Sequence, residues 1–159
     1  MIKITFIAVG KLGEKYWTDS AAEYLKRLGA YCKPAVVEIA EAKLPAKPSQ
    51  AEIAKAVDTE GVAILSQIPA KALVAALCVE GKALSSQELA EFIAKSSSEH
   101  SHILFVIGGS HGLSGDVKQR ANLRLSMSPM TFPHQLARVM LLEQIYRAFT
   151  INAGAKYHK

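Results

Sequence analysis

The chain has 159 residues, of which 50% are hydrophobic and 21% are charged, and its formal net charge is +5. This composition excludes an intrinsically disordered chain, and the length suits one domain with a single sizeable core. No apolar run approaches the roughly 20 residues that a membrane span needs, so we expect one cytoplasmic domain over residues 1–159. The isoelectric point near 9.2 is compatible with a nucleic-acid partner, but many basic proteins bind none.

Strands and helices alternate along the predicted secondary structure. In chain order we expect a strand over 2–9, a helix over 14–29, a strand over 35–40, a helix over 50–67, a strand over 72–79, a helix over 86–97, a strand over 102–107, a helix over 115–121, a strand over 123–127 and a helix over 134–151. Ser49 is the expected N-cap of the second helix, and Ser85 with Glu88 forms a capping-box pattern before the third. Gly81 is expected to turn the chain between them.

Two of the strands are continuous apolar runs, ALVAALCV at 72–79 and HILFVI at 102–107. Continuous rather than alternating hydrophobicity indicates that both faces of a strand are covered, which is typical of a parallel sheet between helices. We therefore predict an α/β fold with a parallel-rich sheet sandwiched by helices.

Four glycines follow the strand over 102–107, in the stretch GGSHGLSGD. Their spacing is neither the GxGxxG of a dinucleotide-binding fold nor the GxxxxGK[ST] of a P-loop. They are compatible with an ordinary tight turn, or with backbone amides that a ligand approaches closely. The position favours a ligand, because open α/β sheets bind ligands at the carboxyl ends of central parallel strands.

The stretch MSPMTFPHQLAR, residues 127–138, contains two methionines and two prolines and follows the last predicted strand. In a parallel sheet this loop, the glycine turn and the strand end at Leu77 reach the same edge. Together they would form a pocket for a flat, partly apolar ligand with polar edges, such as an adenosine. The alternative for Met127 and Met130 is that they only fill gaps in the core.

Apolar residues occur on all sides of the helix expected over 134–151. Such a helix is buried on more than one side, which predicts a symmetric homodimer, although cover by its own chain would also explain the pattern. On this helix Glu143 and Arg147 can pair at i,i+4. Arg138 has no acid three or four residues away, so we expect it to face a ligand or a phosphate.

The chain ends in Tyr157, which can stack on a base, and His158, which can exchange a proton near neutral pH, followed by a lysine. Termini are often frayed and without function, so these residues alone do not establish a site. Cys32 and Cys78 lack CxxC spacing and are expected to be two reduced, buried thiols. His100 and His102 form an HxH pair, but no Cys or carboxylate lies at metal-ligand spacing from it, so no metal site is expected.

Five blocks in order are GKLGEKYW at 10–17, VIGGSHGL at 106–113, MTFPHQLARV at 130–139, EQIYRAF at 143–149 and YHK at 157–159. With them the whole chain resembles the ribosomal RNA large-subunit methyltransferase H family, SPOUT-class enzymes that methylate N3 of a pseudouridine in 23S rRNA. The resemblance implies a C-terminal trefoil knot, a homodimer, S-adenosylmethionine as cofactor, and a substrate in the large ribosomal subunit or the assembled 70S ribosome. Composition and spacing do not lead to a knot, because unknotted connections are the rule.

The same resemblance implies the residues of the site. The positions that match the family's cofactor-binding residues are Leu77, Gly108, Met127, Ser128, Pro129, Met130, Thr131 and Phe132. Tyr157 and His158 match the tail that helps to form the RNA site. His134, Arg138 and Arg147 are weaker matches to that site. A base that removes the N3 proton contributes about 10²–10⁴-fold, so His158 is the candidate base, with Arg138 as an alternative that stabilises charge on the uracil oxygens.

Two other functions are compatible with the residues. One is a non-catalytic RNA- or nucleotide-binding α/β module, and the other is a flavodoxin-like nucleotide enzyme with an unknotted sheet. Binding of S-adenosylmethionine separates them, because only the methyltransferase predicts it.

Overall fold

Five strands and five helices make up the structure, a computed structural model that describes residues 1–159. The strands are β1 (Lys3–Val9), β2 (Lys33–Ile39), β3 (Leu73–Ala83), β4 (His102–Ile107) and β5 (Leu123–Ser126). The helices are α1 (Lys15–Leu28), α2 (Gln50–Ser66), α3 (Ser86–Glu99), α4 (Gly115–Arg120) and α5 (His134–Asn152). Every element that the sequence predicts is present, and the α/β class is confirmed.

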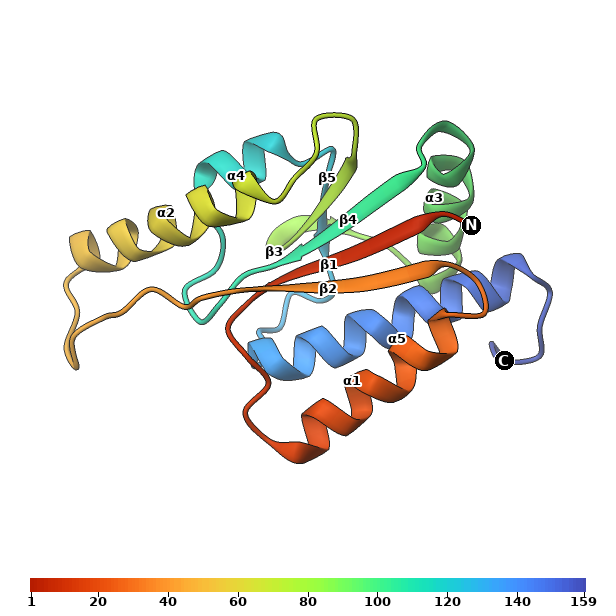
Figure 1. Cartoon of the computed structure of the whole chain (residues 1–159), viewed down its shortest axis with the longest axis horizontal. Helices are drawn as coiled ribbons and strands as arrows, with labels where there is room; N and C mark the ends of the chain where they lie inside the picture. Colours follow the sequence, from red (N-terminus) through yellow and green to blue (C-terminus); the bar gives the residue numbers. More distant parts are fainter.

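The strands form one sheet in the order β2-β1-β4-β3-β5, and every neighbouring pair is parallel. Figure 1 shows α2 and α4 on one side of this sheet and α1 and α5 on the other. Because all strands run the same way, their carboxyl ends lie together along one edge of the sheet, the edge at which the strands end. None of the helices combines the length and apolar character that a membrane crossing requires.

Both faces of the central strands are buried. Phe6 and Phe105 point into the core beneath α1, α3 and α5, where their rings stack with centroids 5.9 Å apart. Ile7 and Val106, the next residues along the same strands, belong to the core beneath α2 and α4. Each side chain of this size contributes about 1.5–3 kcal/mol through burial. Two buried faces explain why these strands are apolar at every position rather than at alternate ones.

Two helices begin with complete capping boxes. The Ser49 hydroxyl accepts a hydrogen bond from the Glu52 amide at 3.1 Å, and the Glu52 carboxylate accepts one from the Ser49 amide at 3.1 Å. Ser85 and Glu88 repeat the arrangement at the start of α3, with distances of 3.1 and 2.6 Å. An N-cap of this kind contributes roughly 1 kcal/mol, so these residues determine where α2 and α3 begin.

β3 differs most from expectation, since it continues through Gly81 to Ala83 instead of ending before a turn. Its register with β5 shifts between Leu77 and Lys82, after which the two strands pair again. A Cβ atom on Gly81 would lie 2.7 Å from the carbonyl carbon and oxygen of Arg124. Gly81 therefore permits the close approach of two backbones at a strand irregularity rather than a turn.

Candidate active site

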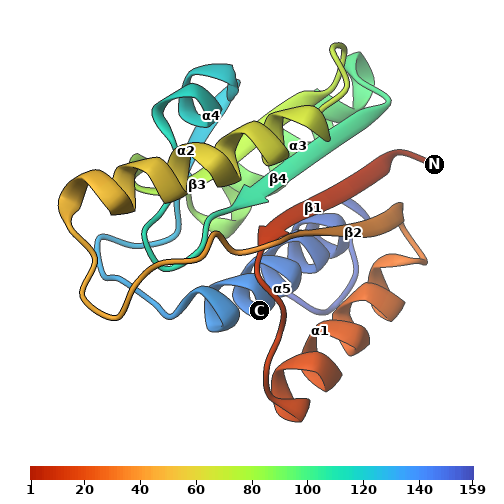
Figure 2. The same cartoon turned by 60° about the vertical axis from the view of Figure 1, so that its left-hand side comes forward.

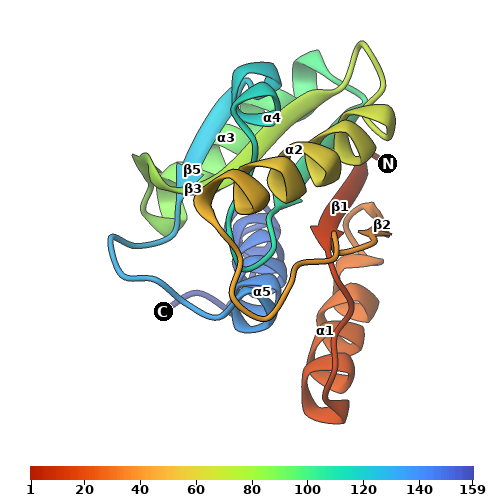
Figure 3. The same ribbon diagram turned by 90° about the vertical axis from the view of Figure 1, so that its left-hand side faces the viewer.

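A cavity of about 830 Å³ lies at the carboxyl ends of β3, β4 and β5, and we call it the slot. It is lined by residues 77–80, 107–113, Lys118, Leu125, 127–128, 130–134 and Ala137. Figure 2 shows the turn after β4 and the start of α5 on the same side of the sheet, and Figure 3 shows the loop after β5 running outwards before it enters α5. The volume lies within the roughly 300–1,000 Å³ of small-molecule sites.

Most of the residues that the resemblance assigns to the cofactor line this one cavity. They are Leu77, Gly108, Met127, Ser128, Met130, Thr131 and Phe132. Pro129 lies in the same loop but does not form part of the wall. The structure thus brings together three segments that are separate in sequence, as the parallel sheet predicts.

Glycine main chain forms the floor of the slot together with the side chains of Ser110 and His111. A Cβ atom on Gly108 would lie 2.8 Å from the carbonyl carbon and oxygen of Gly112, so the turn closes on itself only because Gly108 has none. Gly112 has φ +80°, a conformation that favours glycine, and its amide donates to the Gly109 carbonyl at 3.1 Å. Backbone amides and carbonyls are therefore exposed to a ligand here.

Two serines shape the loop between β5 and α5. The Ser126 hydroxyl donates to the Ser128 carbonyl at 3.1 Å, and the Ser128 hydroxyl accepts from the Met130 amide at 3.0 Å. Met127 packs partly against the core, whereas 71% of Met130 is exposed. Gap filling therefore describes part of the role of Met127 but not that of Met130.

An ion pair lies at the rim of the slot, and sequence reasoning missed it. Lys118 of α4 pairs with Glu80 of β3, and the hydrogen bond from Lys118 holds the pKa of the Glu80 carboxyl below its usual range. Arg124 Nε donates to the Lys118 carbonyl at 3.2 Å, which adds a second cation nearby. Only the sheet order, which places β5 and α4 next to β3, brings these residues together.

A family model described as "Predicted SPOUT methyltransferase" matches residues 2–158 of the chain. The chain belongs to the SPOUT methyltransferase family. A C-terminal trefoil knot, which the sequence resemblance also implies, is typical of SPOUT proteins.

Among solved structures, this SPOUT methyltransferase is similar to a probable methylase family protein from Haemophilus influenzae Rd KW20. The two are 16% identical, with a TM-score of 0.54, and the match covers 99% of this chain and 70% of the other. At this identity the similarity supports the α/β fold alone.

The two cysteines of the SPOUT methyltransferase differ in their surroundings. Cys32 is 1% exposed, and burial raises the pKa of its thiol to about 12. Cys78 is half-buried in the wall of the slot, and its thiol pKa is also raised, mainly by burial and then by the charge of Glu80. Both thiols are free, as the sequence predicts, but only Cys78 adjoins the slot.

We expect a ligand in the slot to protect Cys78 from alkylation. At a concentration of S-adenosylhomocysteine about 100 times its Kd, about 1% of slots are free, so iodoacetamide should label Cys78 up to about 100-fold more slowly. Mass spectrometry of the labelled peptides measures this rate, and Cys32 is the internal control because burial makes it slow in either case. Unchanged labelling of Cys78 at saturating ligand would place the ligand elsewhere.

Arg138 has partners that the sequence does not reveal. Its guanidinium is buried, donating to Glu38 Oε2 at 2.8 Å and to the Gly10 carbonyl at 2.8 Å. Glu38 lies on β2, 100 residues earlier, so a search for acids within α5 cannot find it. The expectation that Arg138 faces a ligand or phosphate is wrong, because both contacts are to protein groups and Arg138 does not line the slot. Its role on the uracil oxygens stays a prediction.

The tail is docked on α5 rather than frayed. Tyr157 donates to Glu143 Oε1 at 3.2 Å, and the Arg147 guanidinium lies 4.8 Å from the centre of the Tyr157 ring. Arg147 also pairs with Glu143, which confirms the expected i,i+4 pair. Burial, followed by a hydrogen bond with Tyr24, raises the pKa of Tyr157 to about 12.

His158 is held at both ring nitrogens. Arg147 Nη1 lies 3.3 Å from Nδ1, and the Gln87 side-chain amide lies 3.1 Å from Nε2. Neither His158 nor Tyr157 lines the slot of its own chain. His158 as the base stays a prediction, and within a single chain it does not reach the slot.

α5 is covered largely by its own chain. Leu141, Leu142, Ile145 and Ala148 are at most 1% exposed and belong to the core that α1 and α3 share. No residue of 134–151 is fully exposed. The apolar pattern of α5 therefore does not require a second subunit, and the homodimer stays a prediction.

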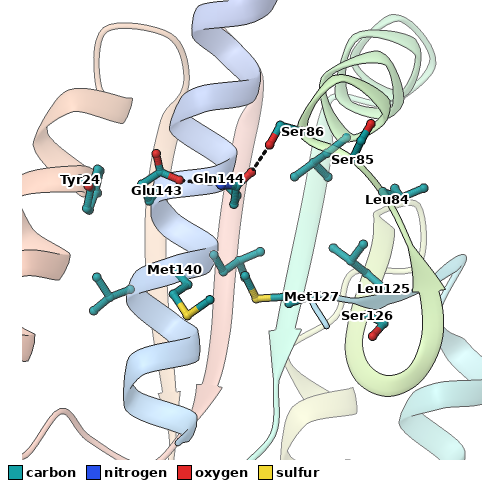
Figure 4. Close-up of a pocket in the computed structure, with 13 residues that line it drawn as sticks. Tyr24, Leu84, Ser85, Ser86, Leu125, Ser126, Met127, Met140, Glu143 and Gln144 are labelled. Carbon is teal, nitrogen blue, oxygen red and sulfur yellow. Dashed lines mark hydrogen bonds between the residues drawn. The ribbon is translucent and has the colours of Figure 1, made fainter. Parts of the chain in front are cut away.

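A second cavity of about 500 Å³ lies between α5, the start of α3 and the end of β5. Figure 4 shows Met127 and Met140 among its walls, together with the hydrogen bond of 2.8 Å from Ser86 to Gln144. Leu125 and Met127 line both cavities, so they form a common wall. Substitutions of Met127 would therefore affect both cavities.

Proposed function

We propose that this SPOUT methyltransferase transfers the methyl group of S-adenosylmethionine to N3 of a pseudouridine in 23S rRNA. The observation that carries the proposal is the slot, where most of the residues assigned to the cofactor line one cavity at the carboxyl edge of the sheet. The preference for a pseudouridine rests on the five sequence blocks shared with the ribosomal methyltransferase family.

The slot suits an adenosyl group in size and chemistry. Gly108 and Gly112 place main chain in the lining of the slot, and Phe132 and Met127 supply apolar wall for a flat ring. Glu80 and Lys118 at the rim match the ammonium and carboxylate of the amino-acid end. When bound, S-adenosylmethionine supplies an electrophilic methyl group on a sulfonium.

The main task of the residues around the slot is to hold two reactants in line. Orientation of this kind lowers a barrier by up to about 7–11 kcal/mol in favourable intramolecular reactions. The loop after β5 borders the slot on one side, and the glycine turn borders it on the other. Besides positioning the two reactants, the protein has only to remove one proton for the reaction to begin.

The proposed active form is a homodimer in which the tail of one chain reaches the slot of the other. This would reconcile the assignment of Tyr157 and His158 to the RNA site with their absence from the slot of their own chain. Tyr157 would stack on a base and His158 would contact the RNA backbone.

A mixing experiment tests this arrangement. We expect Gly108→Val, with an intact tail, and a variant lacking residues 157–159, with an intact slot, each to be inactive as purified. Mixed and refolded together, they should recover a substantial fraction of methyl transfer, because a heterodimer contains one complete site. A mixture as inactive as its components, although sedimentation shows heterodimers, would contradict a shared site.

Methyl transfer from isotope-labelled S-adenosylmethionine tests the function itself. We expect label on ribosomes that contain the pseudouridine and none on ribosomes that carry uridine at that position. Comparison of separated large subunits with assembled 70S ribosomes shows which particle is recognised. Labelling of the uridine-containing ribosomes at the same rate would show that methyl transfer is not specific for the pseudouridine. No label on any RNA would overturn the proposed reaction.

A further inference from the structure

Proton acceptors are scarce among the residues that line the slot. The side chains there that titrate are Cys78, Glu80, His111, Lys118 and His134. The Cys78 thiol has a raised pKa and stays protonated, while Lys118 lowers the pKa of Glu80 and makes it a weak base. Lys118 is itself a paired cation. The remaining titratable side chains of the slot are the imidazoles of His111 and His134, and an imidazole is the most frequent general base in enzymes.

His134 is held more firmly than His111. His111 is exposed on the glycine turn, whereas His134 is half-buried at the start of α5. The next residue, Gln135, accepts a hydrogen bond from the Gly13 amide at 2.7 Å, and Arg138 one turn later donates to the Gly10 carbonyl. This turn of α5 is thus fastened to the loop between β1 and α1, and a group on a rigid element keeps a defined geometry.

The Glu41 carboxylate and the His134 ring both lie beside Gly10, without a hydrogen bond or ion pair between them. The position that a Cβ atom on Gly10 would occupy is 3.9 Å from His134 Nε2 and 3.9 Å from Glu41 Oε2. The other carboxylate oxygen of Glu41 is 3.9 Å from the corresponding position on Gly109, in the turn that forms the slot floor. The segment after β2 that carries Glu41 runs along the same edge of the sheet (Figure 2).

We propose that His134 accepts the proton of the target N–H during methyl transfer, and that Glu41 is a positioning residue that stabilises the resulting imidazolium. The inference rests on the proposed function. It differs from the role assigned to His158, since His134 belongs to the chain that holds the cofactor and requires no partner for this step.

The N3–H bond breaks, and the proton passes to the unprotonated ring nitrogen of His134. The electron pair left on N3 forms the new bond to the methyl carbon, while the carbon–sulfur bond breaks with its electron pair going to sulfur, which becomes a neutral thioether. The imidazolium then loses its proton to water.

Four variants test the roles of these residues. His134→Asn and His134→Ala remove the base, Glu41→Gln removes the carboxylate charge, and His100→Asn, at the end of α3, is the control. We expect kcat of His134→Asn to fall by about 10²–10⁴-fold. We also expect its affinity for S-adenosylmethionine and its thermal unfolding to match the unaltered protein. Glu41→Gln should lower kcat by less, and added imidazole should restore part of the activity of His134→Ala.

A binding measurement adds a readout independent of turnover. In nuclear magnetic resonance spectra, the His134 ring signals, assigned by their loss in His134→Asn, should shift on addition of S-adenosylhomocysteine, while those of His100 should not. A His134→Asn enzyme with unaltered kcat, or loss of activity in His134→Ala without imidazole rescue, would overturn the role of His134 and leave the proposed function intact. Failure of the unaltered protein to bind S-adenosylmethionine would instead overturn the proposed function.

Discussion

Replacing Gly108 by valine should abolish binding of S-adenosylmethionine. A Cβ atom at this position would lie 2.8 Å from the carbonyl carbon and oxygen of Gly112, and two further methyl groups make the overlap worse. The atoms in the way are main chain, so they cannot move aside as a flexible side chain could. The turn between β4 and α4 must open, which costs about 1–3 kcal/mol and displaces the backbone that faces the ligand.

Titration calorimetry measures the effect on affinity, and we expect a loss well above tenfold. Gly115→Ala is the matched control, because a Cβ atom there has nothing within 4 Å and the backbone φ is not positive. The control should bind as the unaltered protein does. Normal affinity in Gly108→Val would show that the glycine turn is not part of the cofactor site.

Arg138→Met should destabilise the protein rather than act on the reaction directly. The substitution keeps an apolar stem but leaves the Gly10 carbonyl and one oxygen of Glu38 without their donor. Loss of a buried donor costs about 1–3 kcal/mol, and the 38% exposure of the Glu38 side chain argues for less than the 3–5 kcal/mol of a fully buried pair. Urea denaturation of Arg138→Met measures the change in the free energy of unfolding.

Lys15→Met is the control for Arg138, because the Lys15–Asp19 pair has side chains 87% and 59% exposed and should matter little. Arg138→Lys keeps the charge but cannot reproduce both hydrogen bonds. Its free energy of unfolding should therefore lie between those of Arg138→Met and Lys15→Met. Unaltered stability of Arg138→Met, together with weaker binding of RNA, would restore the ligand-facing role that the sequence suggested.

Much of the fold could be predicted because its signals are local. The capping residues Ser49 and Ser85 fix helix starts within a few residues, and the apolar runs of β3 and β4 indicate a parallel sheet with both faces covered. That sheet in turn predicts the edge at which Leu77 and Gly108 meet. The second half of β3 was missed, because it forms only through pairing with β5 after the irregularity at Gly81.

The partners of charged residues could not be predicted, because they depend on which strands lie side by side. Glu38 and Arg138 are 100 residues apart, and Glu80 and Lys118 are 38 apart, so no periodicity within one helix links them. The docking of His158 on Arg147 is likewise a property of the folded tail and not of its composition. Whether His158 reaches the slot of a second chain depends in the same way on the assembled protein, so its role as the base stays a prediction.

The central claim is that the loops at the carboxyl ends of β3, β4 and β5 form the site for the adenosyl group. A crystal structure of the protein with S-adenosylhomocysteine tests it most directly. We predict density for the ligand between the main chain at Gly108 and the loop from Met127 to Phe132, with its adenosyl group in the slot. Ligand bound at another surface, or none in crystals grown at saturating concentration, would contradict the account.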